Sequence, residues 1–207
     1  MENQKILHPT NNFNSQSKIP AVFIDKDGTL IEDVPNNVDP QLMQLTTGAI
    51  EGLQLLSKAG YKLIVITNQS GVARGYFPES ALVAVEARSR EILAEAGILL
   101  DGFYYCPHHP NGVVSEYAIA CECRKPKPGL ILRAAAQQNI DLSNSWFIGD
   151  SLCDVEAGHS AGCKTILIDK GNQSESQISC LEIADYIVSN LSIAAQAICK
   201  HSLANLG

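Results

Sequence analysis

From residue 19 onward, short apolar runs alternate with helix-length segments. Apolar runs of this length predict strands at 21–24, 63–66, 103–105, 146–148, 165–168 and 186–188. The amphipathic segments predict helices at 49–59, 79–96, 130–139, 155–161 and 191–200. Gly60 and Gly97 stand just past the first two helices, where glycine commonly ends a helix. Strands that are apolar on both faces and alternate with helices predict an α/β fold, with a Rossmann-like parallel sheet covered by helices on both faces.

Length and composition predict one folded domain. The 207 residues are 45% hydrophobic and 18% charged, which suits a globular enzyme with its own core. Residues 1–18 are rich in Asn, Gln and Ser, so we expect a disordered N-terminal arm followed by a domain over 19–207. The net charge of -7 argues against a nucleic-acid partner, because such proteins usually carry a basic patch.

The amino-acid sequence also predicts where in the cell the protein is found. No run of 18 or more apolar residues exists, so we expect no membrane partner. The polar N-terminus lacks the apolar centre of a secretory signal. Both features predict a cytoplasmic chain.

Two carboxylates follow the first expected strand. Asp25 and Asp27 stand at positions i and i+2, and Gly28 comes next. Their oxygens suit Mg²⁺, which binds through a few carboxylates together with the phosphate of a substrate. One carboxylate can also act as a nucleophile toward phosphorus. The structural alternative is an ordinary D-x-D-G turn.

The second expected strand is followed by polar groups that can bind phosphate oxygens, namely Thr67, Asn68, Gln69 and Ser70. Hydroxyl, amide and backbone N–H groups at the end of a strand serve this purpose. In parallel sheets, ligands bind beyond the carboxyl ends of the strands. An equally weighted alternative is that these side chains cap the following segment.

A basic loop and a further carboxylate come later. Arg124 and Lys125 lie in a proline-rich loop that is held stiff by its rings, and both cation types bind phosphate. Asp150 follows the strand at 146–148 as a third metal carboxylate, and Asp154 could support the metal or the lysine. The alternatives are a solvated basic turn and helix capping by Asp150. Each group alone is a weak signal, but their occurrence together after successive strands predicts one shared site.

The four segments FIDKDGTL, ITNQSG, CRKPKPG and FIGDSLCD resemble the four motifs of the haloacid dehalogenase (HAD) superfamily of phosphatases. The resemblance spans most of the chain and implies a phosphatase without a large cap domain. It implies that Asp25 is the nucleophile, through an aspartyl-phosphate intermediate, and that Asp27 is the general acid and base. It further implies that Thr67 and Lys125 bind the phosphoryl group. Mg²⁺ would be held by the Asp25 side chain, the Asp27 backbone carbonyl and Asp150.

A cysteine-rich segment precedes the basic loop. Cys106-Pro107-His108 and Cys121-Glu122-Cys123 bracket residues 109–120, and three thiolates with one imidazole match a structural zinc site. His109 could replace His108, and the spacing leaves that choice open. The alternatives are metal-free thiols and a redox pair, although the expected redox motif is C-x-x-C. The other cysteines are interpreted as small hydrophobic residues: Cys153, Cys163, Cys180 and Cys199.

The segment from CPHHPNG to CECRKPKPG is also similar to the zinc loop of the bacterial heptose bisphosphate phosphatases within the superfamily. That resemblance implies zinc ligands at Cys106, His108, Cys121 and Cys123, and a monomer acting on a small phosphorylated sugar. The implied reaction is hydrolysis of the 7-phosphate of D-glycero-D-manno-heptose 1,7-bisphosphate, for lipopolysaccharide or surface-glycan synthesis. The implied substrate-binding residues are Asn68, Gln69, Ser70, Arg124, Asp33 and Asn36.

Histidinol-phosphate phosphatase shares the zinc loop and all four motifs, so it remains the alternative. Polynucleotide 3′-phosphatase is disfavoured by the acidic net charge, and a catalytically silent binding module by the complete set of motif residues. The loop Asp33–Asn37 and Ser151 depart from the best-known relatives. They leave the sugar and its anomer open.

Overall fold

The computed structural model describes residues 17–171 and 183–204, so nearly all of the expected arm at 1–18 lies outside the described residues. Six parallel strands form one sheet in the order β3-β2-β1-β4-β5-β6. The strands are β1 (Ala21–Ile24), β2 (Lys62–Asn68), β3 (Gly102–Cys106), β4 (Trp146–Gly149), β5 (Lys164–Ile168) and β6 (Tyr186–Val188). The helices are α1 (Ala49–Lys58), α2 (Ala81–Glu95), α3 (Gly129–Gln138), α4 (Leu152–Ala161) and α6 (Leu191–Ala204), with short 3₁₀ turns at Pro40–Leu42 and Leu142–Asn144.

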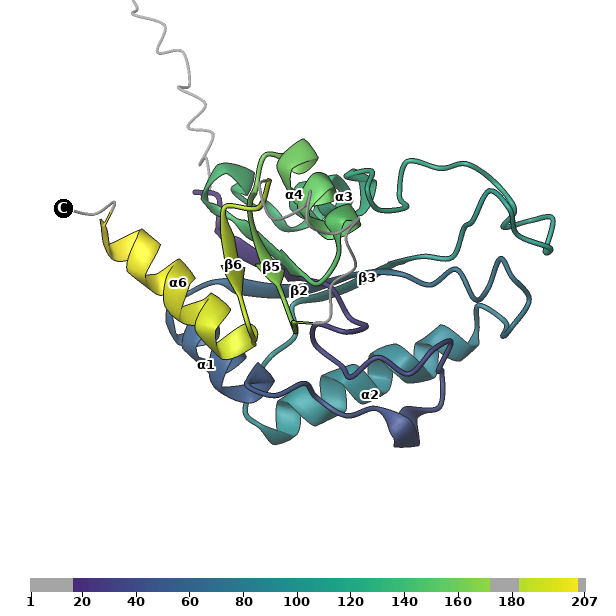
Figure 1. Cartoon of the computed structure of the whole chain (residues 1–207), viewed down its shortest axis with the longest axis horizontal. Coiled ribbons are helices and arrows are strands. Elements are labelled where there is room, and N and C mark those ends of the chain that lie inside the picture. The colour runs from purple at the N-terminus through teal and green to yellow at the C-terminus, as the bar shows by residue number, and fades with distance from the viewer. Residues whose placement is uncertain (1–16, 172–182, 205–207) are drawn as a thin grey trace, which may run out of the picture.

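Helices cover both faces of the sheet, which confirms the predicted fold class (Figure 1). Because side chains alternate along a strand, β1 supplies both cores. Val22 and Ile24 pack in the cluster that also contains side chains of α1, α2 and α6. Phe23 packs in the second cluster, with side chains of α3 and α4. None of the helices in the described ranges is both long and apolar enough to cross a membrane.

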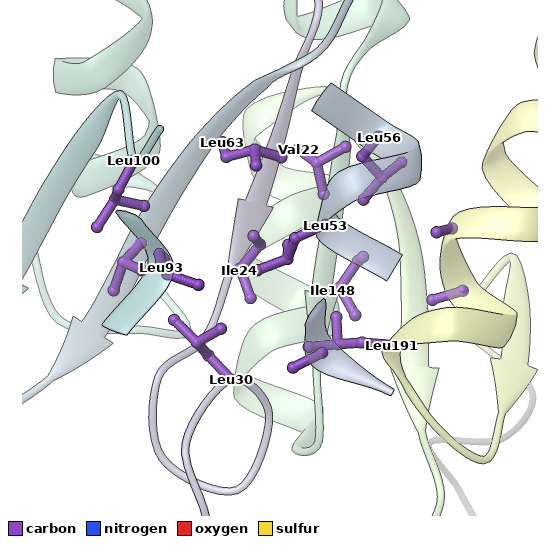
Figure 2. Close-up of a cluster of buried hydrophobic side chains, with 14 of the residues drawn as sticks. Val22, Ile24, Leu30, Leu53, Leu56, Leu63, Leu93, Leu100, Ile148 and Leu191 are labelled. Atoms are coloured by element: carbon purple, nitrogen blue, oxygen red, sulfur yellow. The ribbon is translucent and has the colours of Figure 1, made fainter. Parts of the chain in front are cut away.

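The larger core lies under α1, at the middle of the sheet. Figure 2 shows Leu53 and Leu56 of α1 directed toward Val22 and Ile24 of β1, with Leu191 beside them. All five side chains are fully buried. Burying one such side chain stabilises the fold by roughly 1.5–3 kcal/mol. This packing fixes β1, and therefore fixes the loop that begins at its carboxyl end.

The predicted elements are all present, and their ends differ by a few residues. The largest difference at a helix start is in α4, which begins at Leu152 rather than at 155. Ser151 and Asp154 form a capping box that starts the helix one turn earlier. At the other end of the chain, α6 extends to Ala204. Strand β2 continues through Asn68, so Thr67 and Asn68 belong to the strand itself.

No cap domain interrupts the described residues 17–171; the main insertion is residues 107–128, between β3 and α3. This insertion and the loop after β2 extend side by side beyond the sheet (Figure 1). The backbone N–H groups of Val113 and Val114 both donate to the carbonyl of Ala73, at 2.8 and 3.0 Å. The insertion therefore braces the loop that follows β2.

Candidate active site

A buried lysine and three carboxylates meet at the carboxyl edge of the sheet. Carboxylate oxygens of Asp25, Asp150 and Asp154 lie within 4.8 Å of one another. Lys125 is only 5% exposed. Its Nζ contacts Asp25 Oδ1, lies 2.6 Å from Asp154 Oδ1 and donates to the carbonyl of Ile66 at 3.1 Å. The structure thus brings together four groups from three parts of the chain, residues 25, 125 and 150–154, that lie at least 25 residues apart in the sequence.

Local geometry explains how Asp150 reaches this point. Gly28 has a φ of +81°, and a Cβ at this position would lie 2.0 Å from Asp150 Oδ2. Only glycine accommodates both the left-handed conformation and the neighbouring carboxylate. The N-cap of α4 is Ser151, whose backbone N–H and Oγ both donate to Asp154 Oδ2. The alternative role of Asp150 as a helix cap is therefore wrong, and Asp154 bonds to both the cap and the lysine.

The charges of this cluster perturb one another. Burial raises the pKa of Asp25 well above its usual range, Lys125 opposes that shift, and Asp154 and Asp150 add to it. Burial and the charge of Asp154 raise the pKa of Asp150 to about 6. Burial acts to lower the pKa of Lys125, but the adjacent Asp154 and Asp25 raise it above its usual value. Lys125 is therefore a permanent cation between two carboxylates.

The donor set fits a divalent cation. Three carboxylates and one ammonium group leave two negative charges unbalanced when all four are ionised. Oxygen ligands in a partly open, acidic cluster are those that Mg²⁺ prefers. Asp25 and Asp150 would hold the ion, because both carboxylate oxygens of Asp154 are already bonded, one to Lys125 and one to Ser151, whereas Asp25 contacts Lys125 through Oδ1. The side chain of Asp27 lies outside this cluster, as expected if only its backbone carbonyl binds the metal.

A second network holds Asp27. Gln69 Nε2 donates to Asp27 Oδ2 at 2.8 Å and to Thr67 Oγ1 at 3.0 Å. The other carboxylate oxygen, Oδ1, contacts the Nζ of Lys26, a side chain that is only 2% exposed. Thr67 is thus linked to the first motif through Gln69. Sequence reasoning missed Lys26, and a cation between two acidic residues at a strand end was the available signal.

The expected substrate-binding residues form a small cavity beside Asp27. Asp33, Asn36, Gln69 and Ser70 line it together with Asn68 and Phe77, and its volume is about 100 Å³. Asp33 and Asn36 are exposed, at the outer rim. Arg124 does not line this cavity. Its Nη1 instead donates to the backbone carbonyl of His108 at 3.4 Å.

The cysteine-rich segment closes into a compact cluster. The three Sγ atoms of Cys106, Cys121 and Cys123 lie 3.2–3.6 Å apart, and all three residues are free thiols. His108 Nδ1 lies 3.3 Å from the Cys123 sulfur. A tetrahedral zinc with bonds of about 2.3 Å would place sulfurs about 3.8 Å apart, so the donor set fits zinc after a small expansion.

The structure excludes His109 from this cluster. Its Nε2 lies 3.3 Å from Nη2 of Arg74, and its Nδ1 accepts from the backbone N–H of Asn111 at 3.1 Å. His108 is therefore the histidine that could complete a four-ligand metal site with the three cysteines. Of the remaining cysteines, Cys163 is buried as expected, but Cys153 is exposed on the first turn of α4, and Cys180 lies outside the described residues.

Comparisons with known proteins show the family to which the chain belongs. A family model described as HAD-hydrolase-like matches residues 122–194. D-glycero-β-D-manno-heptose-1,7-bisphosphate 7-phosphatase of Escherichia coli K12 is 37% identical over 183 residues, covering 88% of this chain and 95% of the relative. The enzyme of the same name from Pasteurella multocida is 45% identical over 152 residues, covering 73% and 82%. The chain belongs to the HAD-like hydrolase family.

Solved structures of HAD-like phosphatases have the same fold. D,D-heptose 1,7-bisphosphate phosphatase from B. bronchiseptica, in complex with magnesium and phosphate, superposes with a TM-score of 0.76 at 27% identity, covering 88% of this chain and 99% of that one. A HAD-like phosphatase from Mesorhizobium loti gives 0.73 at 31% identity, with 88% of each chain covered. This chain is therefore a phosphoric monoester hydrolase of the HAD-like family.

Proposed function

We propose that this HAD-like phosphatase removes the 7-phosphate of D-glycero-D-manno-heptose 1,7-bisphosphate. The observation that carries the proposal is the identity of 37–45% to curated enzymes of that name, over most of their length. The small polar cavity beside Asp27 supports it, because amide, hydroxyl and carboxylate groups suit the hydroxyls of a sugar.

The first half of the reaction uses Asp25 as nucleophile. Its carboxylate oxygen attacks phosphorus, an aspartyl-phosphate forms, and the bond to the sugar oxygen breaks. Lys125, which contacts Asp25, offsets the repulsion between the anionic nucleophile and the anionic ester. Mg²⁺ held by Asp25, the Asp27 carbonyl and Asp150 would supply further positive charge for the transferring group.

Proton transfer is the role of Asp27. Its protonated carboxyl gives a proton to the departing sugar oxygen, and the resulting carboxylate then takes a proton from the water that attacks the aspartyl-phosphate. Gln69 holds this carboxyl and the hydroxyl of Thr67 from one amide nitrogen, so the acid/base group and a phosphate-binding group keep a fixed relation. The products are orthophosphate and the sugar 1-phosphate.

The zinc is proposed to be structural. Cys123 and Lys125 are two residues apart, so a closed Cys₃His centre would position the basic loop without taking part in the reaction. Thiols and imidazole fill all four positions, which leaves none for substrate.

A substrate panel tests the proposal. Initial rates with Mg²⁺ would be measured for heptose 1,7-bisphosphate, histidinol phosphate and a generic aryl phosphate, with the Asp25→Asn variant as the background control. We expect kcat/KM for the heptose bisphosphate to exceed that for histidinol phosphate by at least about 100-fold, because the cavity would otherwise leave polar groups unpaired. Faster hydrolysis of histidinol phosphate would overturn the proposal in favour of the alternative.

The wider setting follows from this substrate. Removal of the 7-phosphate fits the synthesis of nucleotide-activated heptose for lipopolysaccharide or a surface glycan. A cytoplasmic location and a monomeric state remain predictions from the sequence. Light scattering coupled to size-exclusion chromatography tests the second, since a monomer has the chain mass of 22.3 kDa.

A further inference from the structure

Lys125 must be placed accurately, yet it does not lie in a helix or strand. Residues 124–128 form a turn between the cysteine cluster and α3. A misplacement of about 1 Å at a catalytic group can cost on the order of 100-fold in rate. Some contact outside the turn must therefore hold the main chain of Lys125 against the sheet.

That contact is the side-chain amide of Asn68, the last residue of β2. Its Oδ1 accepts from the backbone N–H of Lys125 at 3.1 Å, and its Nδ2 donates to the backbone carbonyl of Lys125 at 3.2 Å. The amide thus pairs with both main-chain groups of one residue, as a neighbouring strand would. Further back on the same strand, the carbonyl of Ile66 accepts from Lys125 Nζ at 3.1 Å.

We propose that Asn68 is a positioning residue for Lys125, a role separate from the substrate contact that the family resemblance implies. One N–H and one oxygen lone pair of its amide are used by the two bonds to Lys125, and Asn68 also lines the cavity beside Asp27. The inference rests on the phosphatase activity of the family and not on the identity of the sugar. Strand β2, next to the centre of the sheet, is the rigid reference to which the lysine is attached.

Two variants separate the two bonds. Asn68→Asp keeps an acceptor for the Lys125 N–H but places a second oxygen against the Lys125 carbonyl, whereas Asn68→Ala removes both bonds. Kinetics would be measured on the best substrate of the panel, whichever that is. We expect kcat to fall by roughly 10- to 100-fold in both variants, because Lys125 acts on the transferring phosphoryl group, whereas loss of a substrate contact alone would raise KM and leave kcat unchanged.

Hydrogen exchange of the Lys125 amide gives an independent readout. The N–H is protected by Asn68 Oδ1, so exchange should accelerate in Asn68→Ala and stay closer to wild type in Asn68→Asp. Circular dichroism and zinc content confirm folding of each variant, and Asn111→Asp on the cysteine-rich insertion is the matched surface control. An increase in KM at unchanged kcat, or an unchanged exchange rate in Asn68→Ala, would refute the positioning role. Failure of the heptose assay alone would leave it intact.

Discussion

Replacing Asp150 by Asn should stabilise the metal-free protein while removing its response to Mg²⁺. The carboxylate lies near Asp25 and Asp154 and is partly buried, and its pKa is raised from 3.8 to about 6. A raised carboxyl pKa means that the folded state holds the proton more tightly than the unfolded state does. Stability from this group is therefore complete below pH 3.8 and is lost as the pH rises through about 6.

The magnitude follows from the shift. About two pH units at 1.36 kcal/mol each give a cost on the order of 3 kcal/mol at pH 7.5 in the absence of metal. A neutral amide of the same shape does not pay this cost. For a domain of this size, about 3 kcal/mol corresponds to roughly 6–12 °C in Tm. Ionised Asp150 is unfavourable in the metal-free fold because the Mg²⁺ that is expected to balance its charge is not bound.

The assay is thermal unfolding at pH 7.5 and 5.5, in buffer freed of Mg²⁺ without a chelator, so that zinc is retained. Asp150→Asn should have the higher Tm at pH 7.5, and the difference should shrink by about 1 kcal/mol at pH 5.5, where wild type regains its proton. Saturating Mg²⁺ at about 100 times its Kd should stabilise wild type by about 2.7 kcal/mol and the variant far less. A variant no more stable than wild type at pH 7.5 would refute the reasoning.

Three further predictions concern the nucleophile, the glycine at the metal and the cysteine cluster. Asp25→Asn should lower phosphate release by at least about 1,000-fold, because an amide cannot form the phosphoenzyme; near-normal turnover would exclude Asp25 as nucleophile. Gly28→Ala should destabilise the protein by more than Gly60→Ala and abolish activity: both glycines have a positive φ of +81° and +86°, but only the first Cβ meets a carboxylate. Equal unfolding free energies and activities in these two variants would contradict the crowding at Asp150. Cys121→Ser should lose the zinc measured by elemental analysis and much of the activity, with Cys199→Ser on α6 as the control that keeps one zinc per chain. A Cys121→Ser protein that retained a full zinc would remove Cys121 from the ligand set.

The local pattern determined the elements and most of the chemistry. The six strands and five α-helices of the described residues follow from apolar periodicity, with Gly60 and Gly97 marking the ends of two helices, because these signals act over a few neighbouring residues. The two short 3₁₀ helices were not predicted. The order of a carboxylate pair, a hydroxyl, a lysine and a carboxylate after successive strands predicted a shared site, since parallel strands bring their carboxyl ends to one edge.

Only the tertiary structure decided which atoms meet. The fold brings His108, and not His109, to the three cysteines. It also forms contacts between residues that are far apart in the sequence: Asp154 with Lys125, Gln69 with Asp27 and Asn68 with Lys125. Two adjacent histidines have the same spacing to the cysteines within one residue, so spacing could not separate them. Side-chain amides bond to whatever the packed sheet places beside them, and that neighbour is fixed by the fold as a whole.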